Sequence, residues 1–117
     1  MLLTAADGTF LIGTYVDGNG DGVRTRDIAD GIDAPVDVPV RLSSLFPHVT
    51  LLLNDPAVTS TFDSSALMSF SPLGTASSRT LYLRGADRSQ FAVRVLGATG
   101  RTRVLRLVAN GAWVEIL

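Results

Sequence analysis

Alternating hydrophobic and polar positions are the main pattern of this chain. Short stretches rich in β-branched and aromatic residues recur along it, and clusters of Gly, Pro, Asn, Asp and Ser separate them. Such stretches are typical of β-strands, because successive side chains of a strand point to opposite faces of a sheet. The stretches that we interpret as strands are residues 9–16, 36–42, 49–53, 66–70, 80–83, 91–96, 102–108 and 112–116.

Two of these stretches carry more detailed predictions. In residues 36–42 the apolar side chains stand at even positions, which predicts a half-buried strand, and Pro39 places it at a sheet edge because proline lacks an amide donor. Asn110-Gly111 lies between the last two stretches. This pair predicts a hairpin with a type I′ turn, in which both central residues have positive φ.

The fold class follows from these elements. No amphipathic helical pattern extends beyond about two turns, and no repeat, low-complexity tract or linker divides the 117 residues. A chain of this length suits one domain. The sequence therefore predicts a single all-β domain over residues 1–117, a β-sandwich of about seven mostly antiparallel strands with polar loops at its ends.

Composition excludes several classes of site. Hydrophobic residues make up 46% of the chain, yet no run approaches the roughly 18–20 apolar residues that cross a bilayer. The first residues do not resemble a secretory signal, so we expect any export signal to lie upstream or to be absent. The chain has no cysteine, which excludes disulfides, thiolate metal sites and cysteine nucleophiles.

The groups that catalysis most often uses are scarce. His48 is the only histidine and Glu115 the only glutamate, and neither lies in a recognisable nucleophile or metal motif. There is also no G-x-S-x-G sequence around a serine. We therefore do not expect an enzyme, and we interpret His48 as a surface or capping residue.

Charge is divided unevenly along the chain. Residues 1–63 contain nine Asp and three Arg, whereas residues 64–117 contain seven Arg, one Asp and one Glu, and the whole chain carries a net charge of -1. The asymmetry indicates either an anion-binding face in the second half or two halves of one fold that neutralise each other.

The polar loop at residues 17–33 begins like a calcium-binding loop. It has oxygen ligands at positions 1, 3 and 5 and a glycine, Gly22, at position 6, but position 12 is Ile28 where a bidentate carboxylate is required. One hypothesis is a calcium ion held by Asp17, Asn19, Asp21 and Asp27. The alternative is a polar turn whose Asp and Asn side chains bind their own backbone. No other cofactor is expected.

Gly100-Arg101-Thr102-Arg103 places two guanidinium groups two residues apart, on the same side of an extended chain. This spacing suits two successive phosphates, which arginine binds with paired donors. We expect Arg94 and Arg106 to extend the patch. The alternative is a solvated strand end that pairs with the Asp-rich half.

The order of several short motifs resembles the globular domain of GspH/FimT-type pseudopilins, minor pilin-like subunits of bacterial type II secretion systems and type IV pili. The resemblance covers roughly residues 9–108. The motifs are Y-V-D-G-N-G-D-G at 15–22, F-S-P-L-G at 70–74 (with Pro72 and Gly74), T-L-Y-L at 80–83, F-A-V-R-V-L at 91–96 and A-T-G-R-T-R at 98–103.

The resemblance implies a β-sandwich that follows a long hydrophobic N-terminal helix. In the family this helix anchors the subunit in the inner membrane and later packs into the filament core. Its sequence is not part of this chain, from which we expect a shortened chain or an assigned start that lies too far downstream, with membrane contact only through that helix. The resemblance also implies no catalytic residue, no cofactor and a place in the bacterial cell envelope, on the periplasmic side of the inner membrane or in an extracellular pilus.

Two functions follow from the resemblance. The first is that of a structural minor pseudopilin, whose partners are other pilin or pseudopilin subunits. The second is that of a minor pilin for DNA uptake, because a G-R-x-R element contacts DNA in FimT-like members and Gly100, Arg101 and Arg103 match it. Outside the family, a calcium-stabilised β-module is a third hypothesis.

Overall fold

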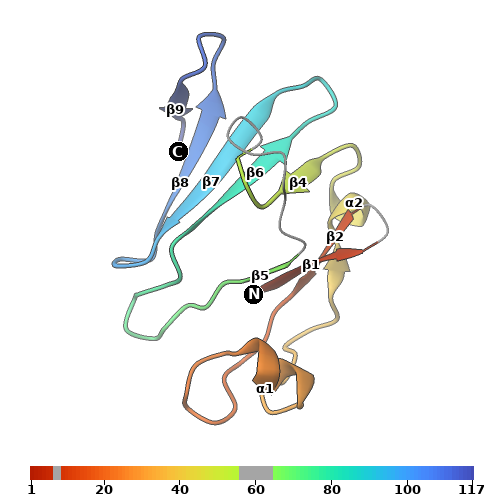
Figure 1. Ribbon diagram of the computed structural model, residues 1–117, viewed down its shortest axis with the longest axis vertical. Helices are drawn as coiled ribbons and strands as arrows, with labels where there is room; N and C mark the ends of the chain where they lie inside the picture. Colours follow the sequence, from red (N-terminus) through yellow and green to blue (C-terminus); the bar gives the residue numbers. More distant parts are fainter. Residues whose placement is uncertain (7–8, 56–64) are drawn as a thin grey trace.

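Nine strands and two short helices form the part of the chain that this computed structural model describes, residues 1–6, 9–55 and 65–117 (Figure 1). In chain order they are β1 (Leu2–Ala6), β2 (Thr9–Gly13), α1 (Thr25–Ala29), β3 (Val40–Arg41), α2 (Leu42–Leu45), β4 (Thr50–Leu52), β5 (Ser65–Leu67), β6 (Arg79–Arg84), β7 (Gln90–Leu96), β8 (Arg101–Leu107) and β9 (Trp113–Glu115).

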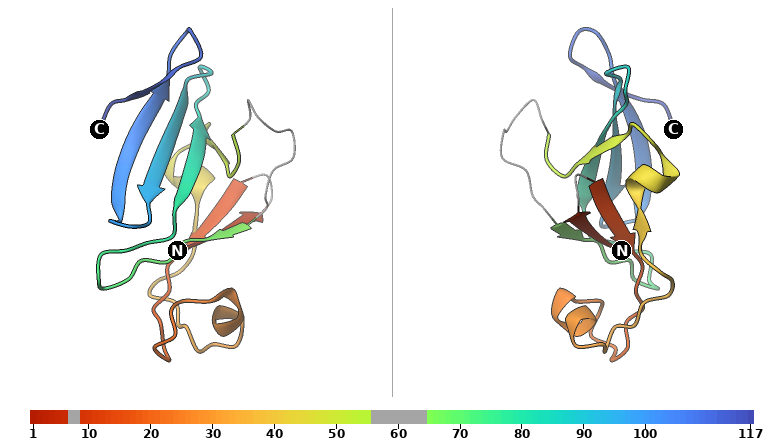
Figure 2. Two further views of the ribbon diagram at one scale, coloured as in Figure 1. Left: turned by 60° about the vertical axis from the view of Figure 1, so that its left-hand side comes forward. Right: turned by 90° about the vertical axis from the view of Figure 1, so that its right-hand side faces the viewer.

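The strands form two antiparallel sheets. One has the order β3-β2-β1-β5 and the other the order β4-β6-β7-β8-β9. Figure 2 shows the two sheets as separate layers, with α1 and its loop beyond the end of the four-stranded sheet. The prediction of an all-β sandwich is confirmed.

A small apolar core lies between the sheets. Its buried members come from both sides: Leu3 from β1, Leu51 from β4 and Leu42 from α2. Leu81 and Leu83 of β6 pack against them. Because Leu81 and Leu83 lie opposite Val93 and Phe91 of β7, the face of the five-stranded sheet that carries these side chains is its inner face.

The outer face of the five-stranded sheet has a smaller apolar cluster. Tyr82, Ala92 and Leu105 lie side by side across β6, β7 and β8. The ring of Tyr82 meets that of Trp113 edge to face, with their centroids 5.9 Å apart. Ala92 and Leu105 are buried in this cluster, so the outer face is not simply a solvated surface.

Most predicted strands are confirmed, and one was missed. The stretches 49–53, 80–83, 91–96, 102–108 and 112–116 correspond to β4, β6, β7, β8 and β9 within two residues at either end. β1 was not predicted, because L-L-T-A-A has little β-branched content. It nevertheless pairs with both β2 and β5, and this pairing makes it an inner strand of its sheet.

The prediction of a half-buried strand over residues 36–42 is wrong in length and burial, since β3 is short and exposed, but β3 does lie at a sheet edge as predicted. Only Val40 and Arg41 pair with β2, and Leu42 already begins α2. The backbone upstream is held in a separate bridge, in which the Val36 N–H donates to the Thr14 carbonyl at 2.8 Å. Pro39 interrupts pairing between the two regions because it has no N–H, and Val36 remains exposed.

The hairpin at Asn110-Gly111 is confirmed, but its type I′ turn is not. Only Gly111 has a positive φ, 84°. The N–H of Gly111 donates to the Val108 carbonyl at 3.0 Å, and the N–H of Val108 donates to the Ala112 carbonyl at 2.9 Å. These bonds close a three-residue loop. The Asn110 side chain accepts the Ala112 N–H at 3.0 Å, which favours this conformation.

Among the helices of the described residues, none has the length and apolar content that a membrane crossing requires.

Candidate functional site

Three of the four arginines predicted to bind anions share the outer face of the five-stranded sheet. The pairing of β7 with β8 sets Arg94 opposite Arg103 and Leu96 opposite Arg101. Opposite residues of an antiparallel pair project to the same face, and this face also carries Leu105. Two like charges directly opposite each other repel, so an anion between Arg94 and Arg103 would relieve an unfavourable contact.

Arg103 has one acidic neighbour on the same face. Its Nη1 lies 3.4 Å from Oε2 of Glu115. Both side chains are more than a third exposed, and water weakens such a pair to about 0–1 kcal/mol. The Nε of Arg103 is buried and has no hydrogen-bond partner among the described residues. The guanidinium is therefore only partly satisfied by the protein.

Arg106 does not lie on the face that carries Arg101 and Arg103. It is opposite Phe91, and its guanidinium carbon lies 6.0 Å from the centre of that ring. Residues 103 and 106 differ by an odd number, so their side chains point to opposite faces of the strand. Of the four arginines that the sequence predicts to bind anions, those on the outer face are thus Arg94, Arg101 and Arg103.

The two glycine-containing motifs meet in space. The F-S-P-L-G turn is closed by the Gly74 N–H, which donates to the Ser71 carbonyl at 3.2 Å, and Pro72 lies exposed within it. Gly100 has a φ of 65°, and a Cβ there would lie 3.0 Å from the Gly74 carbonyl oxygen. Gly100 therefore has a structural role, which is to let the β7–β8 turn lie against the 71–74 turn.

Asp17 organises the first half of the polar loop. Its carboxylate accepts the backbone N–H groups of Asn19 (3.2 Å), Gly20 (2.9 Å) and Gly22 (2.8 Å). The bond from Gly22 has the largest effect in holding the pKa of Asp17 below its ordinary value of 3.8. The loop thus contains the self-bonded turn proposed as the alternative to a calcium site.

The other predicted calcium ligands gather around Asn19. In one orientation its amide donates to Oδ2 of Asp27 at 3.4 Å, and in the other it donates to Asp17 and Asp21. Burial raises the pKa of Asp27, and the nearby charge of Asp21 adds to this effect.

Calcium binding stays a prediction. Among the described residues, no three His, Cys, Asp or Glu side chains are grouped closely enough to hold a metal ion. Calorimetry with millimolar calcium is the test. A heat of binding with a higher melting temperature would support the hypothesis, and the absence of both would remove it.

Asp33 was missed in the sequence and is the most buried charged residue described, with 0% exposure. Its Oδ1 accepts the Gly18 N–H at 2.9 Å and its Oδ2 the Arg24 N–H at 2.8 Å. It therefore connects the start of the loop to the residue before α1. The only signal in the sequence is an aspartate between Ile32 and Ala34, which is too weak to distinguish it from the other aspartates.

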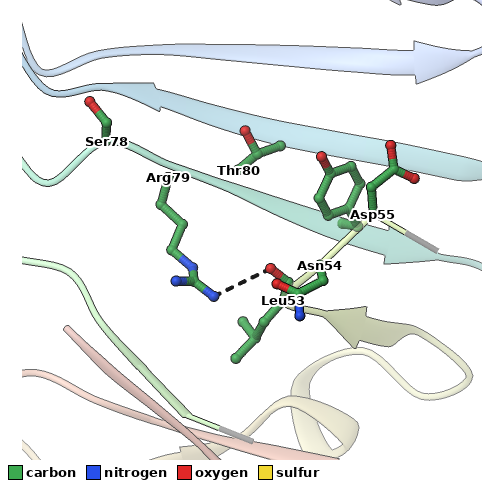
Figure 3. A pocket seen from close by; sticks show the side chains of 7 residues that line it. Leu53, Asn54, Asp55, Ser78, Arg79 and Thr80 are labelled. Atoms are coloured by element: carbon green, nitrogen blue, oxygen red, sulfur yellow. Dashed lines mark hydrogen bonds between the residues drawn. The ribbon is translucent and has the colours of Figure 1, made fainter. Parts of the chain in front are cut away.

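A separate polar pocket of about 490 Å³ lies beside the end of β4 (Figure 3). Arg79 crosses it, and its Nη2 donates to the Leu53 carbonyl at 3.3 Å. Tyr82 and Asp55 also line the pocket. Burial first, and then the charge of Asp55, raise the pKa of the Tyr82 hydroxyl, so this phenol stays protonated at neutral pH.

Comparison with protein-family models, with curated proteins and with solved structures finds no match to this chain.

Proposed function

We propose that this domain is a structural minor subunit of a type II secretion or type IV pilus filament and acts through protein–protein contacts. One observation carries the proposal: a groove of about 740 Å³ lies between the polar loop and the F-S-P-L-G turn, and its walls include Val16, Phe70 and Pro72. Phe70 is 56% exposed and Leu73, at the tip of the turn, is 91% exposed. Large apolar side chains that gather on a surface are typical of contact sites.

Co-expression with a pilin or pseudopilin subunit tests this function. We expect Phe70→Ser/Leu73→Ser to abolish co-purification with a neighbouring subunit while the melting temperature stays the same, because both side chains are exposed. The matched control is Ile116→Ser/Leu117→Ser, which removes apolar side chains of similar exposure, 49% and 81%. The assignment of the surface would be contradicted if both variants lost binding equally, or if neither variant lost binding.

Binding of double-stranded DNA is the second candidate function. The observation in its favour is that Arg94, Arg101 and Arg103 share one exposed sheet face. Phosphate contacts make DNA affinity fall with salt, and each lost contact lowers the slope of log affinity against log salt concentration by about 0.9. The net charge of -1 means that affinity would come from this local group alone.

A gel shift at low and moderate salt is the appropriate measurement. We expect the original protein to bind DNA weakly and Arg101→Ala/Arg103→Ala to remove most of this binding. In that variant the slope of log affinity against log salt concentration should be smaller in magnitude by about two. Arg106→Ala is the matched control, since this arginine lies on the opposite face and its loss should change little. DNA binding that survives the double substitution would exclude this site.

A further inference from the structure

The outer face of the five-stranded sheet carries two aromatic rings at its centre. Tyr82 belongs to β6 and Trp113 to β9, and their rings meet edge to face with centroids 5.9 Å apart. The ring pair therefore spans the two strands between them, where Ala92 of β7 and Leu105 of β8 are buried. Both aromatic side chains nevertheless remain partly exposed. The face thus offers ring surface to a ligand.

Arginines flank this ring pair at both ends along the strands. Arg84 lies two residues beyond Tyr82 on β6 and so shares its face. On the other side of the rings Arg94 is opposite Thr80, two residues before Tyr82, and it is also opposite Arg103. Residues 80 and 84 are four positions apart, which is about 13 Å along a strand. A ligand that reaches both groups of arginines therefore passes over the rings.

The arginines of this face keep hydrogen-bond donors available. Among the residues that the structure describes, no carboxylate lies within ion-pair distance of Arg84, Arg94 or Arg101. Two carboxylates lie nearby: Glu115, in its exposed ion pair with β8, and Asp55, which lines the same pocket as the tyrosine. Four arginines against two carboxylates leave two net positive charges. The face therefore favours an anion, and guanidinium groups suit phosphates in particular.

We propose that this face binds single-stranded nucleic acid, with bases stacked on Tyr82 and Trp113 and phosphates held by the arginines at either end. Such binding is a form of the second candidate function, on which the proposal rests. In a duplex each base is stacked between its neighbours, whereas an unpaired base can present its π-face to an aromatic side chain. The rings between the arginines therefore add affinity for a single strand only.

Trp113 is the only tryptophan of the chain, so its fluorescence reports a base that stacks on it. Titration with an oligothymidylate of about ten nucleotides at low salt should quench this fluorescence saturably. An abasic oligonucleotide of the same length keeps the phosphates and lacks the bases. We expect it to bind at least about five-fold more weakly and to leave the fluorescence unchanged. A duplex of the same length should also bind more weakly than the single strand.

Variants separate the rings from the charges. We expect Tyr82→Leu, which keeps an apolar side chain at this position, to weaken oligothymidylate binding at least about five-fold and to leave duplex binding unchanged. Arg84→Gln should weaken single-strand binding and reduce the slope of log affinity against log salt concentration by about 0.7 in magnitude. Arg106→Gln is the matched control, since it removes an arginine from the opposite face and should change neither. Thermal melts show whether each variant is folded.

The outcomes distinguish this proposal from DNA binding in general. If the abasic strand or the duplex bound as tightly as oligothymidylate, base stacking would be wrong and the candidate DNA function would stand. If neither single strand nor duplex bound, both would be wrong. An acidic polysaccharide such as polygalacturonate that quenched Trp113 and displaced the oligonucleotide at a lower concentration would overturn the assignment to nucleic acid.

Discussion

Arg88 and Gly111 occupy equivalent positions in two hairpins. In each loop the residue donates its N–H to the carbonyl three positions earlier, Gly85 for Arg88 and Val108 for Gly111. Both have left-handed backbones, with φ of 67° and 84°. For residues with a Cβ this conformation costs about 1–2 kcal/mol, so Arg88 occupies a position that suits glycine.

We therefore expect Arg88→Gly to raise the free energy of unfolding by about 0.5–1 kcal/mol, net of the greater freedom of glycine in the unfolded chain. Gly111→Ala should lower it by about 1 kcal/mol. Urea denaturation measures both. Arg88→Ala is the control for charge, because it keeps the strained backbone and should stay close to the original protein. A gain in Arg88→Ala equal to that in Arg88→Gly would show that charge, not backbone strain, is responsible.

The carboxylate of Asp17 makes stability depend on pH. Its pKa in the folded protein lies below the ordinary value of 3.8 because backbone N–H groups, Gly22 first, stabilise the ionised form. The stabilisation is therefore complete above pH 3.8 and is lost as the pH falls through the lowered pKa. Asp27 affects stability in the opposite direction, because burial raises its pKa in the folded protein above the ordinary value of 3.8. Its stabilising contribution is complete below pH 3.8 and is lost as the pH rises through the raised pKa.

Asp17→Asn should lower stability at neutral pH and make the loss of stability on acidification shallower. Denaturation curves between pH 2 and pH 7 give this comparison, and carboxyl carbon shifts of Asp17 report its pKa directly. A variant whose pH profile parallels that of the original protein would contradict this role of Asp17.

At the scale of the elements, the 71–74 turn packs against the β7–β8 turn at the G-R-x-R sequence. Gly100 allows this packing, whereas the proposed binding residues are the two arginines that follow it. Gly100→Ala would place a Cβ 3.0 Å from the Gly74 carbonyl at a φ of 65°. We expect it to lower stability by about 1–2 kcal/mol. Arg101→Ala should change stability by less than about 0.5 kcal/mol, because its side chain is exposed. Thermal melts compare the two, and equal shifts would mean that Arg101 also supports the fold.

Local pattern predicted the elements whose side chains alternate between a core and a surface. β7 and β8 have such alternation and pair along their length, so the faces of Arg94, Arg101 and Arg103 follow from residue number alone. The local pattern gave a wrong prediction at residues 36–42. Alternation is present there, but Pro39 lacks a hydrogen-bond donor and α2 begins at Leu42. It also failed at β1, whose strand conformation depends on pairing with β2 and β5 and not on its own propensity.

The candidate sites were less predictable than the fold, for a related reason. Asp33 resembles the other aspartates of its loop in sequence, and only the approach of the Gly18 and Arg24 amides makes it distinct. A second example is a groove with apolar walls that α2, the β6–β7 turn and β8 form together. These segments are far apart in the chain, and no short motif indicates that they meet.

At the scale of the whole molecule, shape and burial are the properties that bear on the proposed subunit contacts. Its radius of gyration is 15.2 Å, whereas a compact chain of this length is expected near about 13 Å. Large apolar side chains including Val38, Phe46 and Leu73 are exposed. The isolated domain therefore leaves apolar surface in water that a neighbouring subunit could bury.

From this we expect the isolated domain to show a low dependence of unfolding free energy on urea, near the lower end of the usual range of about 1–3 kcal/mol per molar, because less surface becomes exposed on unfolding. An apolar dye such as ANS should bind the native protein at neutral pH. Addition of the co-purifying subunit should displace the dye and raise the melting temperature, since a partner that binds only the folded state stabilises it.

Phe70→Ser/Leu73→Ser should reduce dye binding and remove the stabilisation by the partner, whereas Ile116→Ser/Leu117→Ser should leave that stabilisation intact. A steep urea dependence without dye binding would mean that the domain is stable alone and that its exposed apolar residues are scattered, not a contact surface.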